Sequence, residues 1–445
     1  MNGIVKRETY SVCPVCLKRV SAKLVERGER TYIDKSCPEH GDFSTLVWNG
    51  RYDLLDWYGC AESVKEGENT HCPNNCGICP DHVSDTCCVL FEVTERCNLN
   101  CTYCFADNSG KPDKSVEELK AQMRDFVVPG KTLVQLSGGE PTVRDDLPDI
   151  VRAAKELGCK YVQLNSNGIR LAEDEDYVRR LAEAGLSFVF MQFDGTNDAV
   201  YMKLRRHPLF SVKEKAIENC SRFGVGVTLV PTLVPGVNVS ETGNILKYAV
   251  GRSPAVRGVH FQPVTYMGHI PNLPDDAARL PLDELIWQIE SQSDGLVKAE
   301  NLLPSACDHP MCGFHGDFAV QEDGTLFPLS SKRDEDSAAC CCGAESAATK
   351  NREFVARRWK RSGAEIAEKK EGSCCCCCCG ETKKPDMGDL DYFLERVRTH
   401  GFTVTAMAFQ DAANLDIERL RRCSLHVYSE GKLKPFCSNY LTPLK

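Results

Sequence analysis

Between residues 89 and 267, short strand-like runs alternate with stretches of helical apolar spacing, and this alternation restricts the fold more than any other feature. The runs are rich in Val, Leu, Phe and Tyr, as in strands buried on both faces, and lie at 89–94, 132–136, 161–165, 187–193, 225–233 and 256–263. Helices are expected after a capping box at Ser115 and over 147–157, 174–184, 212–223 and 241–250. Six such repeats predict an α/β fold with parallel strands and right-handed crossovers, as an open barrel or a doubly wound sheet.

Cysteine is unusually abundant, with 27 residues in a chain of 445. The cytoplasm is the expected compartment, because no stretch approaches the ~20 apolar residues of a membrane span and the N-terminus lacks the apolar core of a signal peptide. Thiols stay reduced there, so grouped cysteines indicate metal ligands rather than disulfides. Cys159 and Cys220 stand alone and are expected to be small buried hydrophobes. A net charge of −9 argues against a general nucleic-acid binder.

The cysteine groups and the repeats divide the chain into four regions. Residues 1–60 form an expected metal-binding module, 61–88 a Cys-rich segment, 89–284 the α/β core and 285–445 a C-terminal region. About 330–384 is a low-complexity insertion that contains the cysteine runs 340–342 and 374–379. Consecutive side chains cannot all bind one metal with good geometry, so this insertion is given no catalytic role.

Three cysteines, Cys97, Cys101 and Cys104, follow the first expected strand within one short loop. Three thiolates at this spacing can hold three irons of a cubane cluster and leave the fourth iron open to a small molecule. A structural zinc site is the alternative, but zinc in such sites takes four protein ligands. The spacing therefore favours an iron–sulfur cluster.

Small and polar residues recur where the following strands are expected to end. The second strand leads into Gly138-Gly139-Glu140-Pro141, the third ends at Asn165, Ser166 and Asn167, and Gln192 and Asp194 end the fourth. Each group alone is an ordinary turn signal. Because the carboxyl ends of parallel strands open on one face, together they predict a shared ligand site beside the cysteine loop.

Residues 89–267 resemble the radical S-adenosylmethionine (SAM) superfamily, whose core is a partial (β/α)6 TIM-type barrel. The resemblance lies in the Cys97–Cys104 loop and in the Gly138–Pro141 loop. The resemblance implies that Cys97, Cys101 and Cys104 hold a 4Fe–4S cluster, and that SAM bound to its open iron is cleaved to a 5′-deoxyadenosyl radical. It also implies that Tyr103 flanks the adenine and that Glu140 accepts a charged hydrogen bond from SAM. The remaining implied SAM contacts are Gly138, Gly139, Pro141, Asn165, Asn167, Gln192 and Asp194.

The flanking modules resemble the tetraether lipid synthase and pterin methyltransferase-like family. The resemblance lies in Cys13-Pro14-Val15-Cys16, in Cys37-Pro38-Glu39-His40-Gly41, and in the segments 72–82 and 307–312, so it covers nearly the whole chain apart from the insertion. It implies a rubredoxin-like or zinc-ribbon module that holds one iron or zinc ion, and a Cys-rich C-terminal region. The implied mononuclear ligands are Cys13, Cys16, Cys37 and His40, with Cys60 as the rival to His40.

The same resemblance implies two auxiliary 4Fe–4S clusters. One would be held by Cys72, Cys76, Cys79 and Cys87, with Cys88 as the alternative to Cys87, and the other by Cys307, Cys312, Cys423 and Cys437. Pairing by sequence alone is under-determined, so unpaired buried thiols are the alternative for the second group.

Three functions are compatible with these motifs. The preferred one is radical coupling of lipid alkyl chains, with peripheral contact at the inner face of the membrane. The second is methylation of a pterin-like ring by a folate-type methylene donor, for which Tyr266, His269 and His315 are polar candidates. Either reaction would use reduced ferredoxin or flavodoxin as electron donor. The third, a metal-handling or electron-transfer protein, leaves the strand-end residues unexplained.

Overall fold

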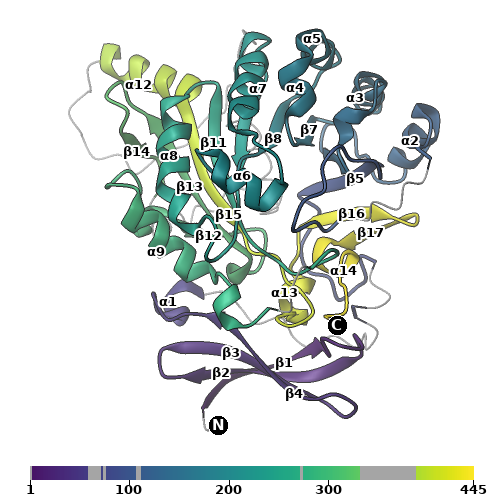
Figure 1. Cartoon of the computed structure of the whole chain (residues 1–445), viewed down its shortest axis with the longest axis vertical. Helices are drawn as coiled ribbons and strands as arrows, with labels where there is room; N and C mark the ends of the chain where they lie inside the picture. The colour runs from purple at the N-terminus through teal and green to yellow at the C-terminus, as the bar shows by residue number, and fades with distance from the viewer. Residues whose placement is uncertain are drawn as a thin grey trace, which may run out of the picture.

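The computed structural model describes residues 3–58, 72–73, 77–106, 112–270, 274–330 and 387–444. Cys60, Cys76 and the low-complexity insertion lie outside these residues. Two sheets organise the described chain, a small antiparallel sheet at the N-terminus and one large sheet that carries nearly every other strand (Figure 1).

The N-terminal sheet is an antiparallel meander of four strands. They are β1 (Ile4–Val12), β2 (Arg19–Arg27), β3 (Arg30–Cys37) and β4 (Gly41–Trp48), paired in that order. Burial alternates along β3, which is typical of a sheet with one solvated face. The short helix α1 (Leu54–Tyr58) follows and buries Trp57.

Six parallel strands form the centre of the large sheet. Their order is that of the sequence: β5 (Cys88–Thr94), β6 (Leu133–Gly138), β7 (Tyr161–Ser166), β8 (Phe188–Gln192), β9 (Gly226–Val230) and β11 (Val256–Pro263), with β10 (Thr232–Leu233) beside β11. All the pairings between these six strands are parallel. The six expected strands are thus present within a few residues, and their parallel pairing agrees with the partial barrel.

Helices cover the outer face of these strands (Figure 1). They are α2 (Val116–Met123), α3 (Leu147–Glu156), α4 (Ile169–Glu173), α5 (Glu175–Glu183), α6 (Asp198–Arg205), α7 (Phe210–Arg222) and α8 (Thr242–Gly251). Ser115 caps α2 in the expected capping box, with Glu118 bonding back to the Ser115 backbone. The apolar faces of the helices and the strands share one large buried core.

The C-terminal region extends the same sheet at both edges, beyond the expected core boundary at residue 284. β15 (Gly401–Met407) pairs in parallel with β11, and β13 (Gly313–Val320) follows it antiparallel, flanked by β12 (Leu303–Pro304) and β14 (Leu326–Pro328). β16 (Leu425–Ser429) pairs in parallel with β5 and forms a hairpin with β17 (Lys432–Pro435). The remaining helices are α9 (Leu282–Gln292), α12 (Met387–His400), α13 (Ile417–Arg421) and α14 (Phe436–Asn439).

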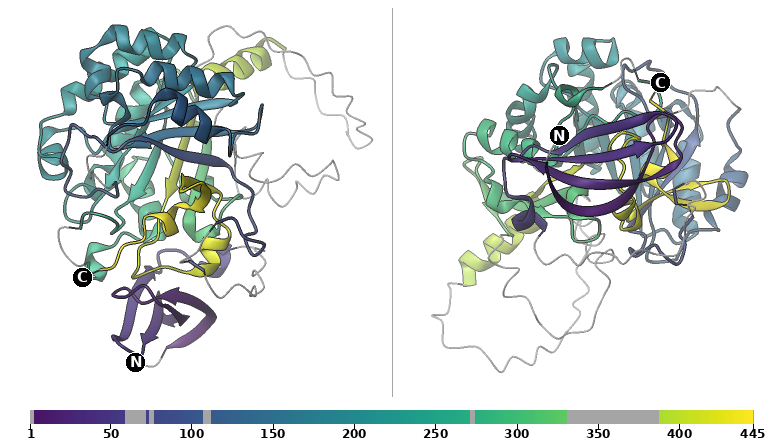
Figure 2. Two further views of the ribbon diagram at one scale, coloured as in Figure 1. Left: turned by 90° about the vertical axis from the view of Figure 1, so that its right-hand side faces the viewer. Right: turned by 90° about the horizontal axis from the view of Figure 1, so that it is seen from below.

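The N-terminal sheet docks on the segment between β15 and β16, at one end of the barrel (Figure 2). Arg7 forms ion pairs with Asp416 and Glu418, and Thr9 Oγ1 donates to Asp416 Oδ1 at 2.7 Å. Lys35 Nζ donates to the carbonyl oxygen of Ala412 at 2.7 Å. Polar contacts from three side chains of β1 and β3 therefore join the N-terminal sheet to the segment 412–418. None of the helices in the described part of the chain has the length and apolar content to span a bilayer.

Candidate active site

A cavity of about 370 Å³ opens at the carboxyl ends of the parallel strands. It brings together most of the residues that the sequence assigned to the cluster and to SAM. The predicted residues that line it are Cys97, Cys101, Tyr103, Cys104, Gly138, Gly139, Glu140, Asn165, Asn167 and Gln192. Pro141 and Asp194 are buried nearby but do not line the cavity.

The cysteine loop between β5 and α2 presents its three thiols to this cavity. Burial raises the pKa of Cys97 to about 11 and also raises the pKa of Cys104. Thiols in such surroundings ionise when a metal binds them. The loop is fixed at its middle, where Thr102 N donates to Leu204 O at 2.9 Å. Three half-buried thiols beside open space fit a cubane that keeps one iron free for SAM.

Two glycines allow the loop after β6 to lie directly on the cysteine loop. Gly138 has a φ of 126°, and a Cβ atom there would clash with Thr94 O. A Cβ atom at Gly139 would clash with Arg96 O. The backbone donates across the same contact, from Gly139 N to Thr94 O at 2.9 Å and from Glu140 N to Arg96 O at 2.8 Å. The glycine pair therefore sets the distance between the two loops.

The Glu140 carboxylate joins the loops after β6 and β7. Oε1 accepts from Thr142 N at 3.1 Å, from Thr142 Oγ1 at 2.6 Å and from Ser166 Oγ at 2.8 Å, and Oε2 accepts from Asn167 N at 2.6 Å. Asn167 Nδ2 in turn donates to Asn98 Oδ1 at 2.7 Å. Burial raises the pKa of Glu140, while these hydrogen bonds oppose the rise. The sequence predicted that this carboxylate contacts SAM, and in the structure it also accepts from four protein donors and so holds the two loops together behind the cysteine loop.

Asp194 is likewise engaged by protein donors. Oδ2 accepts from Arg205 Nε at 2.7 Å and from Gln192 Nε2 at 2.8 Å, and Oδ1 accepts from Arg205 Nη2 at 2.9 Å and from Thr232 N at 3.1 Å. Burial opposes protonation of Arg205, but the Asp194 carboxylate and the Cys101 thiol outweigh it and raise the Arg205 pKa. Because Arg205 also lines the cavity, the role of Asp194 toward a ligand is to hold this guanidinium in place.

Two buried cations at the site, Arg205 and Lys213, were missed by the sequence analysis. Lys213 is fully buried on α7, donates to Asn167 O, and also donates to Gln192 Oε1 at 3.2 Å. Burial lowers the pKa of Lys213 to about 8. One signal was available, since Lys213 shares a helix face with Ala216, Ile217 and Cys220, all of them buried. Arg205 at the end of α6 carried no such signal.

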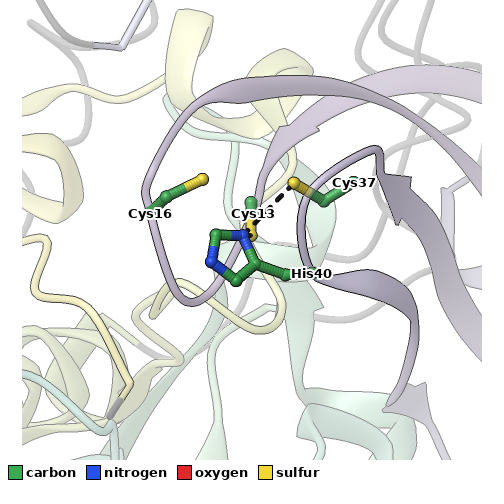
Figure 3. A group of neighbouring side chains, drawn as sticks. All are labelled: Cys13, Cys16, Cys37 and His40. Carbon is green, nitrogen blue, oxygen red and sulfur yellow. Dashed lines mark hydrogen bonds between the residues drawn. The ribbon is translucent and has the colours of Figure 1, made fainter.

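The four predicted ligands of the N-terminal module converge (Figure 3). The ligand atoms of Cys13, Cys16, Cys37 and His40 lie within 4.8 Å of one another. His40 Nδ1 is 3.6 Å from Cys13 Sγ and 3.5 Å from Cys37 Sγ. A hydrogen bond from His40 lowers the pKa of Cys37, which favours the thiolate that a metal needs. Three sulfurs and one imidazole at this spacing fit a structural zinc ion.

The C-terminal thiols separate into two places. Cys312, Cys423 and Cys437 line a second, much smaller cavity together with Arg419, whose Nε donates to Cys312 Sγ at 3.5 Å. Burial raises the pKa of Cys437 to about 12. Cys307 instead lines the large cavity with Cys87 and Cys88, and a hydrogen bond between Cys87 and Cys307, together with burial, raises the Cys307 pKa. The predicted grouping of Cys307 with the other three is therefore only one of two arrangements that the structure permits.

Known proteins resemble this chain over its whole length. The model of the radical SAM superfamily matches residues 91–249, and that of the HMPTM N-terminal zinc ribbon domain matches residues 5–49. A 7,8-dihydro-6-hydroxymethylpterin dimethyltransferase from Methanocaldococcus jannaschii is 32% identical over 489 aligned positions, which cover 98% of this chain and 93% of the relative. This chain belongs to the radical SAM superfamily.

Other similarities are confined to part of this radical SAM enzyme. An Fe-coproporphyrin III synthase from Methanosarcina barkeri is 33% identical over 144 residues, 32% of this chain and 35% of the relative. The crystal structure of methylornithine synthase aligns with 50% of this chain and 66% of its own at a TM-score of 0.36 and 18% identity. The family assignment confirms an enzyme that uses a 4Fe–4S cluster and SAM, and it confirms the predicted partial barrel with an N-terminal zinc ribbon. A protein that only stores metal is therefore excluded.

Proposed function

We propose that this radical SAM enzyme methylates a pterin-like heterocycle. The observation that carries the proposal is the similarity to a pterin dimethyltransferase over 98% of the chain, which includes the zinc ribbon and the C-terminal region as well as the barrel. The sequence analysis preferred lipid coupling, and this similarity reverses that preference. Gln135, Gln163 and Gln262 also line the cavity and offer hydrogen-bonding groups that a heterocycle can use and an alkyl chain cannot.

Different residues around the cavity would hold the cluster, admit SAM and fix the surrounding loops. Cys97, Cys101 and Cys104 would hold the cluster, and Gly138 and Gly139 give SAM access to it. SAM reductively cleaved at that cluster supplies a radical able to remove hydrogen from carbon. Glu140 and Asn167 keep the loops in register, while Arg205 places a fixed positive charge beside Cys101.

The overall reaction needs a reductant as well as a methylene donor. Transfer of a methylene carbon from a folate-type donor to a ring C–H, with reduction to methyl, consumes two electrons and two protons and releases the donor with its two N–H bonds restored. Each SAM that is converted to methionine and 5′-deoxyadenosine consumes two further electrons and one proton. Reduced ferredoxin or flavodoxin is the proposed source of the electrons. We propose a zinc ion at Cys13, Cys16, Cys37 and His40, because these side chains converge to metal-binding distance.

The remaining cysteines are proposed to hold auxiliary iron–sulfur clusters. Cys312, Cys423 and Cys437 converge on one small cavity, and the guanidinium of Arg419 would offset part of the negative charge of a cluster there. Cys87 and Cys307 approach the large cavity, where a second cluster would lie close to the substrate. The other ligands of this second cluster are expected among Cys72, Cys76 and Cys79 of the Cys-rich segment 61–88, of which Cys76 is outside the described residues.

The test is a reconstituted reaction under anaerobic conditions. The purified chain loaded with iron and sulfide is mixed with SAM, reductant, 7,8-dihydro-6-hydroxymethylpterin and a methylene-folate donor, and products are identified by mass spectrometry. We expect 5′-deoxyadenosine together with a pterin heavier by one or two methyl groups. Formation of 5′-deoxyadenosine with the pterin unchanged, and coupling of added diether lipid instead, would overturn the proposal.

A further inference from the structure

On β6 and β7 the side chains inside the barrel change from apolar to polar along the strand. Leu133, Tyr161, Phe188 and Phe190 form a small buried cluster of their own. Two residues beyond Leu133 and Tyr161, carboxamides replace the apolar side chains. Gln135 and Gln163 face each other in register on β6 and β7, and both line the cavity. Interior barrel positions are commonly filled by branched apolar residues, so these two carboxamides are unusual there and offer hydrogen-bonding groups to a ligand.

Gln163 carries a buried acceptor without a partner. Its side chain is completely buried, and Nε2 donates to Asn165 Oδ1 at 2.7 Å, which fixes the orientation of the amide. Oε1 then has no hydrogen-bond partner among the described residues. A buried carbonyl oxygen left in this state is costly, about as much as a lost hydrogen bond. The oxygen is therefore available to an N–H donor that enters the cavity.

His260 on β11 offers a second acceptor to the same cavity. Its Nδ1 lies 2.8 Å from Thr405 Oγ1, and that hydroxyl can donate onward to Val259 O at 3.5 Å. In the tautomer that carries its proton on Nδ1, His260 donates to Thr405 Oγ1 and Nε2 keeps a free lone pair as an acceptor. The imidazole stays neutral, since burial lowers the pKa of His260 to about 4.

An aromatic ring lies next to this acceptor. The Phe190 ring centroid is 5.4 Å from that of His260, with 34° between the planes, and both residues line the cavity. In the strand register Phe190 pairs with Asn165, the residue that holds the Gln163 amide. A flat ring that packs on Phe190 would thus have carboxamide groups toward β7 and the imidazole toward β11.

We infer that Gln163 and His260 form the substrate-recognition subsite, where they accept hydrogen bonds from N–H groups of a flat, amino-substituted heteroaromatic ring packed on Phe190. The inference rests on the proposed function and deepens it, because a dihydropterin carries an exocyclic amino group and ring N–H groups. An alkyl chain carries no such donor and would leave both acceptors unpaired. A site built to bond a substrate N–H discriminates strongly against an analogue without it.

The test measures binding apart from turnover. Equilibrium dialysis of 7,8-dihydro-6-hydroxymethylpterin against the SAM-loaded, cluster-loaded enzyme is compared for wild type, Gln163→Leu, Gln163→Glu, His260→Phe and the control Gln288→Leu on the outer helix α9. We expect the Leu and Phe variants to bind at least ten times more weakly than wild type. The control should bind within threefold of wild type, as should Gln163→Glu, which keeps an acceptor oxygen once the Asn165 amide turns its Nδ2 toward the new carboxylate. Iron content and 5′-deoxyadenosine formation without substrate check that each variant is folded.

A ligand analogue applies the same test to the unaltered enzyme. The 2-dimethylamino derivative of the dihydropterin has no exocyclic N–H, and we expect wild type to bind it at least ten times more weakly than the parent. If wild type binds no dihydropterin, the proposed function fails. If it binds both compounds equally, or if Gln163→Leu and His260→Phe bind the parent as wild type does, the subsite is wrong while the proposed function stands.

Discussion

Glu140→Gln is the substitution that most directly probes how the loops proposed to bind SAM are held together. The two carboxylate oxygens accept from different backbone donors, Oε1 from Thr142 N and Oε2 from Asn167 N. Whichever way a glutamine amide is turned, its NH2 group therefore faces a buried backbone N–H. The hydroxyls of Thr142 and Ser166 can reverse their roles and accept, but the backbone N–H cannot.

The expected cost is one unsatisfied buried N–H plus the loss of charge on the remaining hydrogen bonds. An unsatisfied buried donor costs roughly 1–3 kcal/mol, and a central value of about 2 kcal/mol corresponds to about a 30-fold change in an equilibrium constant. Because Asn167 bonds to Asn98 in the cysteine loop, we expect this cost to weaken SAM binding by about 30-fold while the cluster is retained.

The measurement is the Kd of SAM for the reconstituted variant by equilibrium dialysis, with iron content determined on the same samples. Glu156→Gln on α3 is the matched control, since its half-exposed carboxylate only pairs with Lys120 at the surface. If the SAM Kd of Glu140→Gln is within threefold of the wild-type value, the idea that Glu140 holds these loops together for SAM binding is refuted. Equal weakening in Glu156→Gln would show a general effect of removing a carboxylate.

Three further predictions concern the cluster, the buried ion pair and pH. Cys101→Ala should abolish 5′-deoxyadenosine formation while iron at the auxiliary sites persists; continued SAM cleavage would contradict the ligand assignment. In Asp194→Asn the amide NH2 group faces Arg205 whichever way the amide is turned. Breaking such a buried pair costs roughly 3–5 kcal/mol, so the melting temperature should fall clearly. Asp149→Asn at the surface is the control. For His260, burial places the folded-state pKa at about 4, below the usual 6.5, so between these values the unfolded state binds more protons and stability falls as pH decreases. Between about pH 7 and pH 5, the melting temperature of His260→Phe should therefore fall by less than that of wild type. An equal fall in both proteins would contradict a neutral His260 imidazole in the folded state.

The central fold was predictable because each parallel strand is a short apolar run enclosed by turn signals. The expected strand at 256–263 and β11 have the same bounds, and the other expected strands differ from the observed ones by a few residues. The pairing of β11 with β15 was not predictable, since Val259 and Val404 meet in register across a long stretch that includes the low-complexity insertion. No local pattern encodes so distant a pairing.

The candidate site was predictable where glycine or cysteine spacing has a direct chemical meaning. The Cys97–Cys104 loop and Gly138-Gly139 are of this kind, and the cavity brings them together. The roles of Glu140 and Asp194 were not, because a sequence shows a carboxylate but not the donors that surround it. The similarity to a pterin dimethyltransferase reversed the preferred substrate for a related reason: cysteine groups specify clusters, whereas we propose that strand-interior residues such as Gln163 and His260 select the substrate.

The docking of the N-terminal sheet has a consequence for biosynthesis. Arg7 and Asp416 are 409 positions apart, so the zinc ribbon leaves the ribosome long before the segment on which it packs. Leu444 N bonds to Pro14 O at 2.7 Å, which places the last described residue against the metal-binding loop of the ribbon. The ribbon can take up its metal early, but its docking face remains open to solvent until the segment around Asp416 has been synthesised.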